Sequence, residues 1–211
     1  MVKVSAVLLA AGESRRMGEI NKLELEVEGV PLLRRSANTL LGSALQEIVV
    51  VSGHEAERTT SLLDGLPLHI VYNENYTEGQ MTSVHKGLAS LSQDCDGVMI
   101  CLTDLPLLEA EDVNALIEAF ARREHGSVLV PTFEGKRGNP IILASEHIAA
   151  ILSGERNLGC KRLIEKNPEL VATHAMANNH VVVDLDTRED YLVLQSLLDE
   201  QQKQQHAALS V

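Results

Sequence analysis

The stretch VLLAAGESRRMG at residues 7–18 decides the fold, because it is an apolar strand that stops abruptly at a glycine turn. A second stretch of the same kind, VMICLTDLP at residues 98–106, ends in an acid and a proline. Short, continuous apolar runs indicate strands that are buried on both faces of a sheet. The two runs therefore favour a largely parallel sheet with helices on both sides.

The rest of the chain alternates between short β-branched runs and longer amphipathic stretches. The pattern predicts strands at 3–9, 46–52, 68–72, 97–102, 127–131, 139–143, 170–176 and 180–184. It predicts helices at 32–42, 55–64, 79–91, 109–123, 145–152, 159–166 and 187–203. This order is typical of a Rossmann-like three-layer α/β/α fold with a mostly parallel mixed sheet. Because no linker or repeat divides the chain, we expect one domain over 1–200 and a polar C-terminal tail over 201–211.

Composition excludes several classes of protein. The 211 residues carry a formal net charge of −12, so the chain lacks the basic surface that binds nucleic acid. No apolar run approaches the ~20 residues that span a bilayer, so we expect no membrane partner. The three cysteines are scattered without metal-ligand spacing, which suits a reducing cytoplasm. An acidic chain of this kind must gather cations locally or borrow a metal to handle polyphosphates.

The loop after the first strand combines small residues with cations. In an open α/β sheet, ligands bind beyond the carboxyl ends of the strands, where backbone N–H groups can cradle phosphate oxygens. Arg15, Arg16 and Lys22 follow Gly12 closely, in a chain with only 18 Lys plus Arg. The loop matches neither GxxxxGK[ST] nor GxGxxG. It is therefore either a new phosphate cradle or an ordinary glycine turn beside a solvated basic patch.

Asp104 stands at the end of the second apolar strand. A carboxylate in that position can hold Mg²⁺, which binds proteins through one or two carboxylates together with substrate phosphates. The alternative is that Asp104 caps the helix that follows. The cations of the first loop favour the metal site.

These segments together resemble a known family. LAAGESRRMG at 9–18, followed by Lys22, resembles the LAAGxSxRMG signature of nucleotidyltransferases with a glycosyltransferase-A-like fold, and is most similar to the MobA-like branch that handles the molybdenum cofactor. The resemblance implies that backbone groups of the first four motif residues hold the nucleotide: Leu9, Ala10, Ala11 and Gly12. It also implies that Arg16 and Lys22 contact the triphosphate. Arg15 falls at a variable position of the motif, and TDLP at 103–106 resembles the metal-binding segment that contains Asp104.

Four further segments extend the resemblance to about residue 192. GQMTSVHKGL at 79–88 resembles GxxxSxxxGL and implies that Ser83 contacts the nucleotide, although the segment could also be a helix start without a ligand. DLDTREDY at 184–191 resembles DIDTPEDY with Arg188 in place of proline, and implies Asp186 as the second metal ligand. Asp184 shares its side of an extended segment, and Asp186 could instead be a helix cap. Segments 135–140 and 153–163 resemble RGNP, on the acceptor side, and SGDxGAR.

The resemblance implies a cytoplasmic, Mg²⁺-dependent transferase that moves CMP from CTP onto molybdopterin and releases pyrophosphate. A molybdoenzyme that receives the product is then an expected partner. Three alternatives stay open: a guanylyltransferase of the same cofactor, a cytidylyltransferase of a sugar or polyol phosphate, and an accessory protein that binds the cofactor without catalysis. A phosphate nucleophile is already anionic near neutral pH, which agrees with the absence of a Ser/His/Asp pattern.

Overall fold

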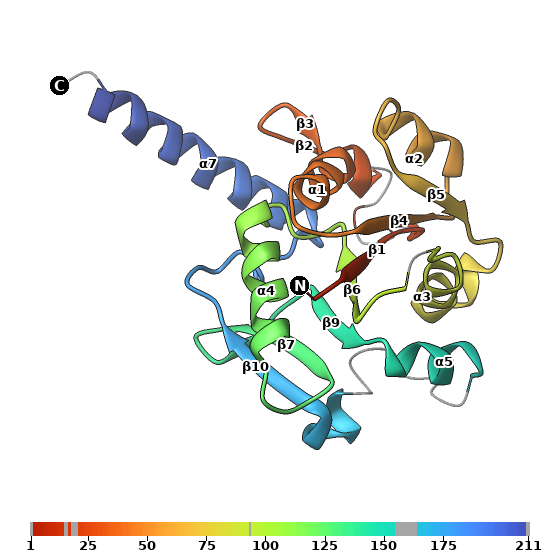
Figure 1. The fold of residues 1–211 in the computed structure, drawn as a ribbon. Helices are drawn as coiled ribbons and strands as arrows, with labels where there is room; N and C mark the ends of the chain where they lie inside the picture. The colour runs from red at the N-terminus through yellow and green to blue at the C-terminus, as the bar shows by residue number, and fades with distance from the viewer. Residues whose placement is uncertain (1, 15–16, 18–20, 93, 155–163, 210–211) are drawn as a thin grey trace.

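One large sheet between two layers of helices forms the body of the molecule (Figure 1). The computed structural model describes residues 2–14, 17, 21–92, 94–154 and 164–209. Across the sheet the strands are β10 (Val171–Ala175), β7 (Val128–Phe133), β9 (Ile141–Ala144), β6 (Gly97–Leu102), β1 (Val4–Ala10), β4 (Glu47–Ser52) and β5 (His69–Tyr72), and β8 (Lys136–Arg137) pairs with β7. β9 runs antiparallel to β6 and β7, as does β8 to β7, and the other pairs are parallel. The predicted α/β/α fold with a mostly parallel mixed sheet is confirmed.

Both faces of the sheet are covered because β1 is apolar on both sides, as its continuous run predicted. Ala6 and Leu8 face the layer of α1 (Leu32–Leu41), α2 (Ala56–Leu62) and α4 (Ala110–Arg122). Val7 and Leu9 face the layer of α3 (Gln80–Ala89) and α5 (Glu146–Leu152). Every residue of β1 is buried. The central strands are therefore a rigid platform for the loops at their ends.

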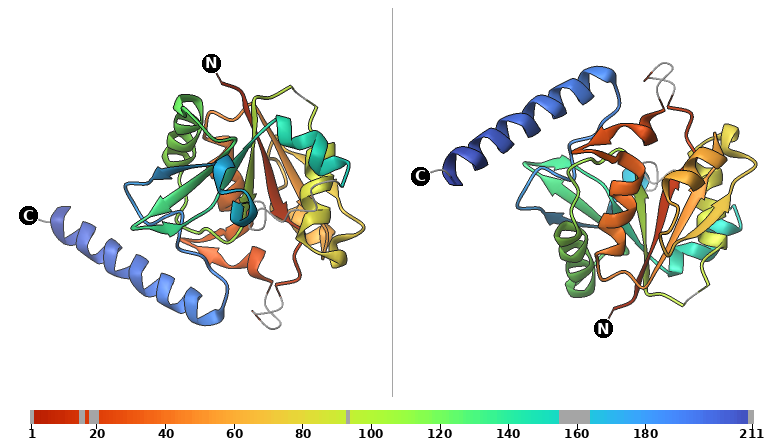
Figure 2. Two further views of the ribbon diagram at one scale, coloured as in Figure 1. Left: turned by 90° about the horizontal axis from the view of Figure 1, so that it is seen from below. Right: turned by 90° about the horizontal axis from the view of Figure 1, so that it is seen from above.

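The last helix, α7 (Arg188–Leu209), begins beside the small antiparallel hairpin of β2 (Glu26–Val27) and β3 (Val30–Pro31). The Tyr191 hydroxyl donates to the Glu26 carbonyl at 2.8 Å, and Leu194 packs in a cluster with Val27 and Leu185. Farther along, α7 projects away from the sheet (Figure 2). Residues 201–209, which the sequence predicted as part of a polar tail, are helical.

Within the described ranges, short 3₁₀ turns also lie at η2 (Lys22–Glu24), η3 (Tyr76–Glu78) and η4 (Pro168–Leu170). The predicted strand at 180–184 is wrong, since these residues form a turn and an irregular segment outside the sheet. The Asn178 side chain accepts a hydrogen bond from the His180 backbone at 3.1 Å, and such local bonds compete with strand pairing. Residues 159–163 of the predicted helix 159–166 lie outside the described residues. Among the described helices, none is long and apolar enough to cross a bilayer.

Candidate active site

The carboxyl ends of β1, β4 and β6 meet at one edge of the sheet. Ala10 pairs with Ser52 of β4, and Leu9 pairs with Leu102 of β6. The loop after β1 and the residues after β6 therefore leave the sheet side by side. A cavity of about 330 Å³ opens there, lined by the β1 loop, the end of β6, the start of α3 and the segment before α7. This is the edge at which open α/β sheets bind ligands.

Lys22 lies between two carboxylates in this cavity. Its Nζ is 3.1 Å from Asp186 Oδ1 and 3.5 Å from Asp104 Oδ2. Lys22 opens η2, whose N-cap is Asn21: the Asn21 side chain accepts from the Leu23 backbone at 3.0 Å. The chain thus brings together three residues from distant segments that the sequence selected separately, with one cation between two acids.

Asp104 is poorly satisfied for a largely buried acid. Its Oδ1 is buried and has no hydrogen-bond partner among the described residues. Burial raises the pKa of Asp104, and the opposing effect of Lys22 does not cancel it. Most buried polar atoms in proteins are paired, so an unpaired carboxylate oxygen at a cavity wall points to a ligand.

Asp186 is positioned by the start of α7. The Leu185 backbone donates to the Asp104 carbonyl at 2.8 Å, which ties this segment to the end of β6. Asp190 accepts from the backbones of Asp186 and Thr187, at 3.0 and 2.7 Å. Hydrogen bonds from the Thr187 side chain and then from these backbone groups lower the pKa of Asp190. Asp190 is therefore the capping acid of this turn, and Asp186 is left facing Lys22.

The two candidates for the second carboxylate differ in environment. Asp186 lines the cavity, whereas Asp184 is exposed and is absent from the described lining. The pair Asp104 and Asp186 fits a divalent ion that completes its shell with substrate phosphates, as Mg²⁺ does. No group of three or more His, Cys, Asp or Glu residues that could hold a metal alone occurs within the described ranges.

The loop after β1 forms the floor of the cavity. Its four predicted nucleotide-binding residues all line it: Leu9, Ala10, Ala11 and Gly12. A Cβ added at Gly12 would meet no atom within 4 Å, so the space beside the Gly12 backbone is open to a ligand. Arg16 lies outside the described residues, and its predicted contact with the triphosphate stays a prediction.

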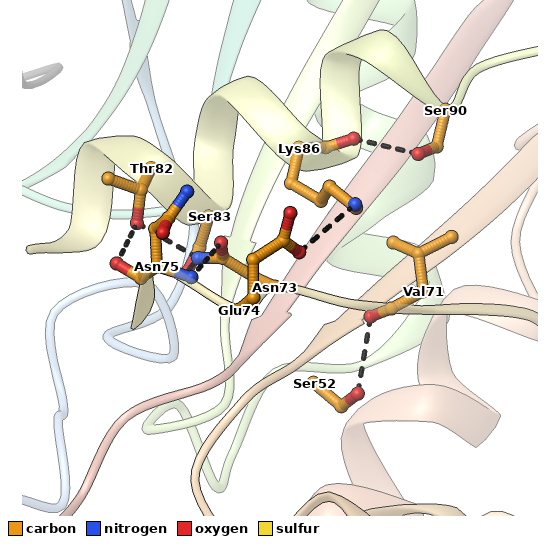
Figure 3. A network of polar contacts seen from close by, with 9 residues as sticks. All are labelled: Ser52, Val71, Asn73, Glu74, Asn75, Thr82, Ser83, Lys86 and Ser90. Carbon is orange, nitrogen blue, oxygen red and sulfur yellow. Dashed lines mark hydrogen bonds and ion pairs between the residues drawn. The ribbon is translucent and has the colours of Figure 1, made fainter. Parts of the chain in front are cut away.

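Ser83, in the first turns of α3, also lines the cavity. Helix α3 lies tightly on β1 at Gly87, where a Cβ would overlap the Val7 side chain. Asn73 donates to the Ser83 hydroxyl at 2.9 Å (Figure 3). A second cavity of about 340 Å³ shares Leu9 with the first and includes Arg137 of the predicted acceptor segment 135–140. Most of the segment 153–163 is outside the described residues.

Sequence reasoning missed Gly53, Tyr76 and Asn73. A Cβ at Gly53 would approach both Ala11 and Tyr76 to 2.7 Å, so Gly53 lets η3 lie close to the β1 loop. Gly53 and Asn73 directly follow parallel strands, and Gly12 lies two residues after the end of one. The rule that led to Gly12 and Asp104 could therefore have found them, since it applies to every strand of the parallel set.

A glycine loop after the first strand, an open backbone beside it, and a lysine shared by two carboxylates lie together at the carboxyl edge of the sheet, where open α/β proteins bind their ligands. Comparison with known proteins gives the family. The MobA-like NTP transferase domain matches residues 6–173. The chain belongs to the MobA-like NTP transferase family and is a nucleotidyltransferase of that family.

Relatives extend over nearly the whole chain. The purine catabolism protein PucB of Bacillus subtilis (strain 168) is 31% identical over 201 residues, 88% of this chain and 92% of its own. Nicotine blue oxidoreductase of Paenarthrobacter nicotinovorans is 26% identical over 193 residues, 88% and 93% of the two chains. A probable molybdenum cofactor guanylyltransferase of Natronomonas pharaonis is 32% identical over 114 residues, 54% and 55% of the two chains. These names cover several activities, so they support the family and leave the substrate open.

Solved structures share the fold. The crystal structure of Rv0371c from Mycobacterium tuberculosis H37Rv has a TM-score of 0.80 at 20% identity and covers 92% of this chain and 97% of its own. A manganese complex of Rv0371c has a TM-score of 0.75 at 18% identity, with 91% and 97% covered. At this identity the likeness establishes the fold alone.

Proposed function

We propose that this protein transfers CMP from CTP to the phosphate of a molybdopterin-type acceptor, with Mg²⁺, and releases pyrophosphate. The observation that carries the proposal is the cluster of Lys22, Asp104 and Asp186 in a cavity whose floor is the glycine loop. The cluster offers a cation and two acids at the place where a triphosphate would approach the Gly12 backbone.

The reaction requires no side chain to remove a proton. An oxygen of the acceptor phosphate attacks the α-phosphorus of the NTP; the new P–O bond forms while the bond to the β-phosphate oxygen breaks, and pyrophosphate leaves. A phosphate monoester is largely dianionic near neutral pH, so this nucleophile is already charged. The described lining of the cavity contains neither histidine nor cysteine, which suits such a reaction.

Catalysis then depends on positioning and on neutralising charge. Lys22 would move from its carboxylate partners toward the phosphates, with Arg16 as the second predicted cation. Asp104 and Asp186 would hold Mg²⁺. When bound, the metal supplies positive charge to the phosphate oxygens, which a chain with a net charge of −12 would otherwise repel. Backbone N–H groups of the loop from Leu9 to Gly12 would orient the nucleotide.

The preference for CTP and molybdopterin is supported by the motifs at 9–18 and 79–88. The second cavity gives an acceptor room beside the first, and Arg137 could meet its phosphate there. GTP is a second candidate donor, because one relative is named a probable molybdenum cofactor guanylyltransferase. A client molybdoenzyme and a cytoplasmic location follow from the same proposal.

Pyrophosphate release tests the proposal. The purified protein is incubated with molybdopterin and Mg²⁺ and with each of the four NTPs in turn. We expect release with CTP that needs both the metal and the acceptor. A clear preference for GTP would assign the protein to guanylyl transfer. Binding of molybdopterin without pyrophosphate release from any NTP would favour the non-catalytic accessory role and contradict the proposal.

A further inference from the structure

A buried amide beneath α3 has a fixed orientation. Asn73 directly follows β5 and is only 2% exposed. Its Oδ1 accepts a hydrogen bond from the Asn75 backbone at 3.0 Å. A backbone N–H can only donate, so it determines which end of the amide is oxygen. The NH₂ group of Asn73 must therefore face α3 (Figure 3).

Both hydrogens of this NH₂ group are used. Asn73 Nδ2 donates to Thr82 Oγ1 and to Ser83 Oγ, each at 2.9 Å. The Thr82 hydroxyl has two carbonyl acceptors within reach, those of Asn75 and Gly79, each at 2.9 Å, and its one proton is shared between them. The Thr82 proton is thus directed at backbone oxygens, and its lone pairs receive the amide. Each donor in this part of the network has a defined direction.

The Ser83 hydroxyl differs from that of Thr82. One of its lone pairs accepts from Asn73, and its own proton has no acceptor among the described residues. Ser83 is 3% exposed and lines the cavity. A buried donor that lacks an acceptor is costly to the folded protein. The proton of Ser83 is therefore directed at whatever occupies the cavity.

We propose that Asn73 is a positioning residue that makes Ser83 a hydrogen-bond donor to the nucleotide, and that this polarity selects a base with acceptors on its Watson–Crick edge. Cytosine presents N3 and O2 as adjacent acceptors there. Guanine presents there one acceptor, O6, beside two donors, N1–H and the N2 amino group, so a Ser83 hydrogen placed for N3 and O2 of cytosine would meet the donors of guanine. The inference rests on the proposed nucleotide site and deepens it, because it names the group that reads the base.

The substitution Asn73→Asp reverses this polarity with almost no change of shape. A carboxylate cannot donate, so the Ser83 hydroxyl would turn its proton toward Asp at position 73 and offer only lone pairs to the cavity. Hydrogen bonds from the Asn75 backbone and from a hydroxyl favour the ionised form of the new carboxyl, and the titrations are run at pH 8, well above the ordinary Asp pKa of about 3.9. We expect CTP to bind about tenfold more weakly, on the scale of one lost hydrogen bond, and GTP to bind no more weakly.

Calorimetric titration with CTP or GTP, in Mg²⁺ and without acceptor, measures the ratio of the CTP and GTP affinities. Asn75→Asp is the matched control: it makes the same change of charge two positions away, on an exposed residue, and should keep the CTP:GTP ratio of the wild type. Ser83→Ala should weaken CTP about tenfold and spare GTP. In the double variant of Asn73→Asp with Ser83→Ala, the change at 73 should have no further effect on the ratio.

Three results would overturn the inference. One is an unchanged CTP:GTP ratio in Asn73→Asp. Another is an equal effect of Asn73→Asp with and without the Ser83 hydroxyl, which a merely structural role of Asn73 would give. If Asn73→Asp does not fold, Ser83→Ala still decides, because equal weakening of CTP and GTP contradicts a donor that reads the base. Absence of any NTP binding by the wild type would instead contradict the proposed function itself.

Discussion

Asp104 and Asp112 are eight residues apart in the chain but differ in the hydrogen bonds that their carboxylates accept. Asp112, in the first turn of α4, accepts from His180 Nδ1 at 2.7 Å, from Asn178 Nδ2 at 2.8 Å and from the Glu109 backbone at 3.0 Å. Asp104, just after β6, has a buried Oδ1 without a partner among the described residues, and its Oδ2 makes a 3.5 Å ion pair with Lys22. Both side chains have little exposure, yet both oxygens of Asp112 accept hydrogen bonds, whereas one oxygen of Asp104 accepts none from the described residues.

The difference separates an acid that holds the fold from one that is available to a ligand. A buried carboxylate whose two oxygens both accept hydrogen bonds stabilises the elements that it joins, here α4 and the turn at 178–180. A buried carboxylate with an unpaired oxygen weakens the fold unless something else binds it. Burial and charge alone would group the two residues together. Their hydrogen bonds distinguish them, and substitutions should do the same.

The largest effect is expected at Lys22, the cation between Asp104 and Asp186. Lys22→Ala should lower kcat/KM for NTP turnover by about 10²-fold or more, on the scale of one lost charge-stabilising donor. Lys3→Ala is the control, since Lys3 is an exposed lysine at the opposite end of β1. Steady-state pyrophosphate assays compare the two, and Arg16→Ala tests the second predicted cation in the same way. Near-wild-type turnover in Lys22→Ala would remove Lys22 from the mechanism.

At Asp112, whose oxygens both accept hydrogen bonds, substitution should lower the stability of the fold and not the catalytic rate. Asp112→Ala leaves His180, Asn178 and a backbone N–H without their acceptor, which should cost about 3 kcal/mol of unfolding free energy. Turnover by the folded fraction should stay within a few-fold of the wild type. Urea denaturation measures the loss, with the exposed neighbour Glu111→Ala as control, expected within ~0.5 kcal/mol of the wild type. A stable Asp112→Ala variant would show that this network does not hold the fold.

Gly87 and Gly12 allow the same comparison for the backbone, because one is packed against the protein and the other faces open space. Gly87→Ala should cost about 1–3 kcal/mol, because the added methyl overlaps Val7 beneath α3. Gly12→Ala should change stability by less than ~0.5 kcal/mol, since its methyl meets no protein atom, while it weakens NTP binding by filling the approach to the loop backbone. Thermal melts and nucleotide titrations of both variants check this. Unaltered NTP affinity in Gly12→Ala would contradict the phosphate cradle.

The smallest effect concerns pH. Burial raises the pKa of Asp104 in the folded protein above its ordinary value of 3.8. The folded state therefore favours the protonated carboxyl. The resulting contribution to the free energy of unfolding is complete below pH 3.8 and is lost as the pH rises through the folded-state pKa. Asp104→Asn cannot ionise. In a metal-chelating buffer it should therefore melt above the wild type at pH 7, and the gap should narrow as pH falls toward 4. A gap that widens toward acid would contradict the sign of this shift.

The fold was largely predictable from the sequence because buried parallel strands are continuous apolar runs, and β1 and β6 show them clearly. The predicted strand 180–184 failed because VVVD has strand composition, while the Asn178 side chain forms a local turn that composition does not reveal. Residues 201–209 continue α7, so the helix predicted over 187–203 extends farther than its pattern indicated.

The site was predictable to the extent that it lies at strand ends. The rule for parallel sheets placed Gly12 and Asp104 at one edge, and the structure brings Lys22 to them. Period-2 reasoning could not choose between Asp184 and Asp186, because the choice depends on the bond from the Leu185 backbone to the Asp104 carbonyl. Such tertiary hydrogen bonds, like those of Asn73, have no local pattern in the sequence.

The central claim is that the unpaired carboxylate of Asp104 is kept for a metal-bound nucleotide. Titration of CTP into wild type and Asp104→Asn, with and without Mg²⁺, tests it most directly. We predict that Mg²⁺ strengthens CTP binding to the wild type, that this gain disappears in Asp104→Asn, and that the variant stays folded with its turnover lost. Full Mg²⁺-dependent binding and turnover in Asp104→Asn would place the metal elsewhere and contradict the account.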